Sequence, residues 1–183
     1  MIGKGKAIGH TANAIEYAKD KKEAVEIDRH LLSGETPTEM AREFEVFHDL
    51  NTRCEKNTFS FVLSPSIEDG KKLAPEQFKE ITQDFLKKMG LENSQYIAYL
   101  HKDKEHKHVH IFTNRVDSMG IAQKDSYIGK ESQRQAQEIA QERGFVVAKD
   151  VQQTKILQVQ KEQLKEADIV KQAHKNVMDK TPK

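Results

Sequence analysis

The most constraining feature of this chain is a short segment, residues 107–116, in which polar and apolar side chains alternate. Successive side chains of a β-strand point to opposite faces of the sheet, so the alternation predicts a strand with one buried face. The buried face would carry Val109, Ile111 and Thr113. The opposite face would carry His108, His110, Phe112 and Asn114. Two histidines at i and i+2 of one strand therefore project side by side.

Paired imidazoles of this kind can hold one metal ion, and a third ligand is available on either side. His101 ends the preceding apolar run, and a hairpin through residues 102–107 would bring it beside the pair. His106 continues the alternation of His108 and His110, but three residues along one strand spread over about 13 Å, which favours His101. Three histidines with open positions suit a catalytic metal. The alternatives are a solvated histidine hairpin or a structural metal site, although structural zinc usually recruits cysteine and Cys54 stands alone.

The rest of the chain reads as short strands interleaved with amphipathic helices. Thr36, Pro37 and Glu39 form a capping-box signature that starts a helix able to turn Met40, Phe44, Phe47 and Leu50 inward. Further strands are expected at residues 58–64 and 96–100, with a weaker one at 2–8. Further helices are expected at residues 11–18, with Thr11 as N-cap, at 75–89 and at 131–143, whereas residues 23–35 show no clear pattern. This order predicts an α+β fold with an antiparallel sheet.

Length and composition bound the class of protein. The 183 residues suit one domain with an appendage, here a domain over residues 1–150 and a polar, helix-compatible tail over 151–183. No apolar run approaches the roughly 18 residues of a membrane span, the N-terminus lacks a signal-peptide pattern, and a single cysteine suits the cytoplasm. A net charge of +1 indicates that any DNA binding depends on local clusters of charge.

Three segments together resemble the relaxases, plasmid mobilisation nucleases that form a branch of the endonucleases with a His-hydrophobic-His motif. The first combines a histidine, an aspartate two residues on, and a His-x-His strand followed by asparagine: His101, Asp103, His108-Val109-His110-Ile111 and Asn114. The second is Asn51-Thr52-Arg53, between a helix and an apolar strand. The third is an early helix with a tyrosine near its end, Ile15-Glu16-Tyr17-Ala18. The resemblance spans about residues 1–150.

The resemblance implies a five-stranded antiparallel sheet flanked by helices, a relaxase-like two-layer sandwich with a metal at its centre. A divalent ion (Mn, Mg or Zn-like) would bind His101, His108 and His110. Tyr17 would attack one DNA strand, held single-stranded at a transfer origin, and form a 5′-phosphotyrosyl link. Asp103 would orient a metal ligand or move a proton. Accessory mobilisation proteins are the implied partners, and conjugative transfer of a mobile element is the implied process.

Several assignments stay open at this point. Tyr127 is the alternative nucleophile, whereas Tyr96 and Tyr99 lie in an apolar strand and read as core residues. DNA contacts are expected from Asn51, Arg53, Asn114 and Arg115, and flanking lysines such as Lys19 and Lys107 are candidates to position phosphates. The competing functions are a rolling-circle replication initiator, a non-catalytic metal-binding or DNA-binding module, and a hydrolytic metallonuclease.

Overall fold

The computed structural model of the chain describes residues 1–102, 105–147, 156–163 and 166. Its contacts form two compact units, Met1–Val146 and Val147–Lys183. In the second unit, residues 156–163 form a helix with Ile156, Leu157 and Val159 exposed. The predicted domain boundary at residue 150 falls outside the described residues and stays a prediction. In the described part of the chain, no helix combines the length and apolar character needed to cross a bilayer.

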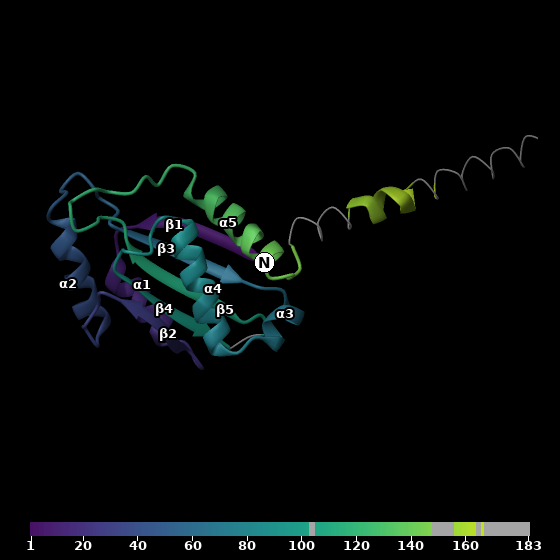
Figure 1. Cartoon of the computed structure of the whole chain (residues 1–183), viewed down its shortest axis with the longest axis horizontal. Helices are drawn as coiled ribbons and strands as arrows, with labels where there is room; N and C mark the ends of the chain where they lie inside the picture. The colour runs from purple at the N-terminus through teal and green to yellow at the C-terminus, as the bar shows by residue number, and fades with distance from the viewer. Residues whose placement is uncertain (103–104, 148–155, 164–165, 167–183) are drawn as a thin grey trace, which may run out of the picture. The chain divides into compact units, whose positions relative to one another are not determined.

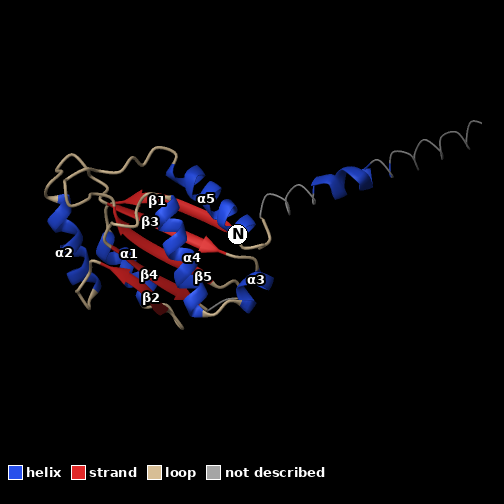
Figure 2. Ribbon diagram, in the orientation of Figure 1, coloured by secondary structure: helices blue, strands red, loops and turns tan. Residues whose placement is uncertain are grey.

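The first unit is built on a five-stranded antiparallel sheet, which confirms the predicted fold class (Figure 2). Its strands stand in the order β1-β3-β5-β4-β2. Their bounds are β1 Ile2–Ile8, β2 Val25–His30, β3 Thr58–Ser64, β4 Tyr96–His101 and β5 His108–Asn114. The histidine strand β5 is therefore central, with β3 and β4 as its neighbours.

The sequence pattern did not predict the strand β2. Its residues Val-Glu-Ile-Asp-Arg-His are mostly polar, and its pairing with β4 shifts register between Glu26 and Asp28. An edge strand pairs on one side only and needs little apolar surface, so its sequence carries a weak periodic signal. The opposite edge strand, β1, was only weakly indicated because Gly3 and Gly5 interrupt it. A Cβ on Gly3 would meet the Ala136 side chain at 2.6 Å, so these glycines allow a helix to approach closely.

The described residues of this unit form five helices: α1 Thr11–Lys19, α2 Pro37–His48, α3 Ile67–Lys72, α4 Pro75–Lys88 and α5 Ile128–Glu142. The predicted capping box of α2 is present, with Thr36 and Glu39 as its partners. The prediction that Thr11 caps α1 is wrong. His10 is the N-cap residue and makes no capping bond, while the Thr11 hydroxyl is buried against that of Thr58 at 2.5 Å. The helix α2 ends at His48, and Leu50 lies beyond it, 58% exposed rather than inward.

Helices cover the two faces of the sheet differently. On one face, α4 and α5 pack over Phe59, Phe61 and Leu63, and the Phe61 ring meets the Phe85 ring of α4 edge-on at 5.2 Å. Figure 1 shows α4 and α5 on the viewer's side of the sheet. On the other face, α1 and α2 enclose a second core that includes Ile15, Ala18, Met40, Phe44, Ile97, Tyr99 and Phe112.

The helices α1 and α2 leave part of the second face uncovered. Along β3, Phe59, Phe61 and Leu63 are buried, whereas Ser60 and Val62, which alternate with them, are only half-buried. On β1, Lys4 and Lys6 are exposed. Register places Lys4 beside Val62, and Lys6 beside Ser60, on this same face. The part of this face over β1, β3 and the start of β5 is therefore open.

Candidate metal centre

Three histidines meet at one end of the two central strands. His101 ends β4 and stands directly opposite His108 on β5, and strand alternation places His110 on the same face. One ligand nitrogen from each ring lies within 4.8 Å of the others, and the ring centroids are 4.5 to 5.0 Å apart. His106, the alternative third ligand, is exposed and stands outside this cluster. The hairpin, not one strand alone, assembles the three rings.

Hydrogen bonds orient two of these rings. The Nε2 of the buried His101 donates to the Ala18 carbonyl oxygen at 2.7 Å, and the Nδ1 of His108 donates to the His106 carbonyl oxygen at 3.0 Å. A carbonyl can only accept, so each of these nitrogens carries the proton. In neutral rings the lone pairs then lie on Nδ1 of His101 and Nε2 of His108. Metal-bound histidines usually donate their second nitrogen in this way, so the arrangement fits a metal ligand set.

The helix α1 brings Tyr17 to the same region. Tyr17 is 62% exposed, and its side chain lines a hollow of about 300 Å³ together with His110. We call this space the α1–β3 hollow; its other lining residues include Lys6, Asn13, Ser60 and Phe112. Ala18, the next residue on the helix, is the one whose carbonyl oxygen accepts from His101. The backbone of α1 is thus bonded to one histidine of the cluster, while its tyrosine borders another.

The ends of α1 are fixed by further polar contacts. At its start, Thr11 contacts Thr58 as described above. At its end, the Lys19 ammonium donates to the Glu35 carbonyl oxygen at 2.6 Å.

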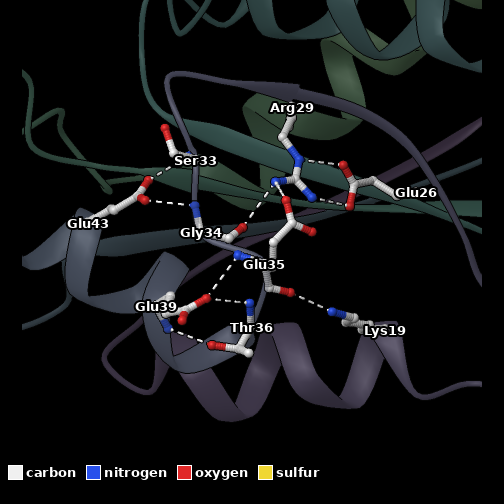
Figure 3. Close-up of polar contacts among 9 residues, drawn as sticks. All are labelled: Lys19, Glu26, Arg29, Ser33, Gly34, Glu35, Thr36, Glu39 and Glu43. Carbon is white, nitrogen blue, oxygen red and sulfur yellow. Dashed lines mark hydrogen bonds and ion pairs between the residues drawn. The ribbon is translucent and has the colours of Figure 1, made fainter.

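Figure 3 shows the turn that contains Glu35, between β2 and α2. There Arg29 bonds Glu26 at 2.7 Å and the Gly34 carbonyl at 3.0 Å, and Glu43 accepts from the Gly34 N–H at 2.7 Å. This network orders the turn whose Glu35 carbonyl accepts from Lys19 at the end of α1.

The other tyrosines have different surroundings. Tyr96 is buried, and burial together with its hydrogen bond to Asp28 at 2.7 Å raises the pKa of its hydroxyl. Tyr99 is also buried, and burial raises the pKa of its hydroxyl to about 12. Both phenols are therefore poor nucleophiles. Tyr127 is 76% exposed with a φ of 60°, but it precedes α5, on the opposite face of the sheet, and does not line the α1–β3 hollow.

The residues expected to contact DNA lie elsewhere. Asn51, Arg53 and Arg115 line a second hollow of about 480 Å³, at the end of β5 away from His108. Arg115 lies seven positions beyond His108 along an extended strand, which is about 23 Å. Arg115 is already engaged with the Gln123 carbonyl at 2.6 Å and with Asp125 at 3.0 Å. Asn51 donates to the Gly120 carbonyl at 2.8 Å.

Asn114 is corrected from a DNA contact to a structural role. Its side chain is fully buried, and its amide nitrogen donates to the Phe44 carbonyl and to Gln95, both at 2.9 Å. Its amide oxygen accepts from the Val116 N–H at 3.0 Å. With these bonds in place, the side chain fastens α2 to the sheet and does not reach the surface. Asp103, the expected orienting or proton-transfer residue, lies outside the described residues.

Two candidate phosphate-binding lysines are engaged, and two others were missed. The ammonium of Lys19 is held by Glu35, and that of Lys107 donates to the Leu73 carbonyl at 3.2 Å. Lys4 and Lys6 were not expected at the site, yet Lys6 lines the same hollow as Tyr17 and His110. The signal that could have found them is the alternation of glycine and lysine in residues 3–6, which places both lysines on one face of a strand.

A family model for the MobA/VirD2-like relaxase nuclease domain matches residues 13–145. The chain belongs to this family. The matched span contains Tyr17 and the three clustered histidines. It supports DNA nicking in mobilisation as the general activity, and favours it over a rolling-circle replication initiator or a non-catalytic binding module.

Comparison with individual proteins adds little. No curated protein matches the chain. A solved structure from a study of the molecular basis of vancomycin resistance transfer in Staphylococcus aureus is 13% identical to it, with a TM-score of 0.45. That likeness covers 79% of this chain and 94% of the other. At this level it carries no inference about the site.

Proposed function

We propose that this relaxase domain nicks one strand of DNA at a transfer origin by transesterification, with Tyr17 as nucleophile and His101, His108 and His110 as metal ligands. The observation that carries the proposal is the shared hollow, in which Tyr17 and His110 border one space large enough for a phosphate and its sugar. The hydrogen bond that His101 donates to the Ala18 carbonyl supports it, because it joins the helix bearing the proposed nucleophile to the histidine cluster.

The covalent step exchanges one phosphoester bond for another. The Tyr17 oxygen forms a bond to the scissile phosphorus, and the bond from phosphorus to the 3′ oxygen breaks. The phenolic proton is lost to a base or to solvent, and the departing 3′ oxygen takes up a proton. The product is a 5′-phosphotyrosyl link and a free 3′ hydroxyl. Because the phosphodiester energy is kept, the reverse attack by that hydroxyl can rejoin the strand.

The histidine cluster fits a divalent metal ion. Three neutral imidazoles suit Mn, Zn, Co or Ni better than Mg, which prefers oxygen ligands. A bound ion would supply Lewis-acid stabilisation of the charge that builds on the scissile phosphate. The role of the chain's own residues is to hold the phosphate between Tyr17 and the cluster. Asp103 remains the proposed residue for orienting a ligand or moving the phenolic proton.

The proposed substrate is single-stranded DNA, in the cytoplasm, with accessory mobilisation proteins as partners. Strand-specific attack requires a scissile phosphate that can descend to the sheet surface between α1 and β1. The open face described above leaves room for such a strand, and a paired duplex would have to melt there first.

The decisive experiment is a covalent-adduct assay. Labelled single-stranded DNA with the transfer origin of the chain's own element is incubated with the protein and Mn²⁺, then resolved on a denaturing gel. We expect a shifted, protease-sensitive band that is absent with EDTA and in Tyr17→Phe, and present in the matched control Tyr127→Phe. A band that survives Tyr17→Phe would move the nucleophile. Cleavage without attached protein would replace the proposal by a hydrolytic metallonuclease.

A further inference from the structure

The uncovered face of the sheet carries a row of side chains that leads from β1 to the histidine cluster. Pairing of β1 with β3 and of β3 with β5 aligns Lys4, Val62 and His110 across three neighbouring strands. The next row aligns Lys6, Ser60 and Phe112. Strands lie about 4.8 Å apart, so the backbone of Lys4 is about 10 Å from that of His110. An extended lysine covers most of that distance.

Charge sets the α1–β3 hollow apart from the other described hollows. Its lining contains Lys6, His10 and His110 but no carboxylate. The hollow beside Arg115 contains Glu55 and Asp125. Two further hollows contain Asp117 in one case, and Asp84 and Glu92 in the other. In a chain with 29 acidic residues, a groove without one favours an anionic occupant.

Lys4 and Lys6 are also uncommitted, unlike several other lysines of the fold. Both are exposed, and neither forms an ion pair or a side-chain hydrogen bond with a described residue. By contrast, Lys79 pairs with Asp28, and Lys88 pairs with Glu142. The ammonium groups of Lys4 and Lys6 therefore have their hydrogen-bonding capacity available for a ligand.

The strand that bears these lysines is held from behind. On the opposite face, α5 packs on the glycines of β1, and the Gly3 N–H donates to Gln133 at 3.0 Å. The methionine amino terminus donates to the Val146 carbonyl. An edge strand fixed in this way keeps its two lysines about 7 Å apart, two residues along one strand. Successive phosphates of an extended single strand have a comparable spacing.

We propose that Lys4 and Lys6 bind the phosphates that flank the scissile one, so that the edge strand β1 sets the register of the DNA against Tyr17. This inference rests on the proposed function for the identity of the strand, and it adds the residues that position it. Lys4 and Lys6 are positioning residues: they contact the backbone of the DNA, not the reacting atoms.

The test measures the salt dependence of DNA binding by the full chain. Fluorescence anisotropy with a labelled single-stranded origin oligonucleotide is recorded from 0.05 to about 0.3 M salt for wild type, Lys4→Gln, Lys6→Gln and the double variant. Each lost phosphate contact on a single strand lowers the slope of log Kd against log salt by about 0.7. That change corresponds to about fivefold weaker binding at about 0.1 M salt for each lysine, relative to a 1 M reference.

Controls separate this surface from the chemistry. Lys87→Gln, on the exposed side of α4 across the sheet, should keep the wild-type slope, and Lys6→Arg should keep most of it. Calorimetric Mn²⁺ binding should be the same in all these variants. If the double variant retains the wild-type slope and affinity, or wild type does not bind the oligonucleotide, the inference is overturned. If the lysines govern binding but wild type forms no adduct, the surface stands and the transesterase proposal fails.

Discussion

Replacing either of two buried tyrosines on β4 by phenylalanine should change the stability of the fold in opposite directions. Tyr99 is 2% exposed, and its hydroxyl forms no hydrogen bond with any described group. The Tyr96 hydroxyl donates to the Asp28 carboxylate at 2.7 Å. Replacing either residue by phenylalanine removes one oxygen and leaves the ring in place, so the pair isolates the hydrogen bond from the packing.

The expected magnitudes follow from those surroundings. An unsatisfied buried hydroxyl costs about 1 to 3 kcal/mol, and its removal also forfeits a few contacts, so Tyr99→Phe should raise the free energy of unfolding by about 1 kcal/mol. A hydrogen bond to a charged group contributes about 1.5 to 3 kcal/mol. Asp28 keeps Gln83 at 2.9 Å and Lys79 at 3.2 Å as partners, so Tyr96→Phe should lower stability by about 1.5 kcal/mol, at the low end.

Urea unfolding at neutral pH, followed by circular dichroism, measures both changes in the free energy of unfolding, and thermal unfolding gives the melting temperatures. For a domain of this size, the melting temperature should rise by about 3 °C in Tyr99→Phe and fall by about 5 °C in Tyr96→Phe. Covalent-adduct formation should persist in both, because neither phenol is the proposed nucleophile. A loss of stability of 1 kcal/mol or more in Tyr99→Phe would refute the reasoning, since it would mean that the hydroxyl has a partner.

Three further predictions concern the site and its supports. His108→Ala should abolish nicking and calorimetric Mn²⁺ binding, because it removes a central ligand, while His106→Ala should retain both; activity in purified His108→Ala would contradict the proposed centre. Asn114→Ala should lower the free energy of unfolding by about 2 to 3 kcal/mol in urea, since it strands the Phe44 carbonyl and the Val116 N–H, and the folded variant should bind DNA as wild type does. Burial raises the pKa of Tyr99 to about 12 from 10.0, so the folded state resists ionisation: stability should be steady below pH 10 and fall between pH 10 and 12, and unfolding curves in Tyr99→Phe should show a shallower fall.

The sequence predicted the histidine hairpin because its evidence is local. Alternation fixed which side chains of residues 107–116 share a face, and the length of the connection to His101 left one economical way to add a third ring. The capping box of α2 was equally local, since Thr36 and Glu39 satisfy each other within one turn. Both predictions depend on residues that are close in the chain.

The parts that sequence reasoning missed depend on distant partners. Asparagine is a polar residue that is usually exposed. Asn114 is buried because Phe44 and Gln95, which are distant in the sequence, lie beside it at the end of β5 and accept its hydrogen bonds. The lysines of β1 are placed beside the histidine cluster by two strand pairings, each of which joins residues about 50 positions apart. Thr11 looked like a helix cap because the sequence does not reveal Thr58, which occupies its hydroxyl instead.

The elements that carry the candidate site differ in local stability. Its histidines stand on β4 and β5, whose hydrogen-bond ladders are flanked by other strands, and central strands of this kind have opening free energies close to that of global unfolding. The tyrosine stands on α1, nine residues long and therefore too short to be stable without its packing and its bond to His101. If Tyr17 forms the proposed covalent link, opening α1 alone would draw the joined strand away from the cluster, and refolding of α1 would return it. Hydrogen exchange faster in α1 than in β5 would show that the helix opens while the histidine strands stay folded.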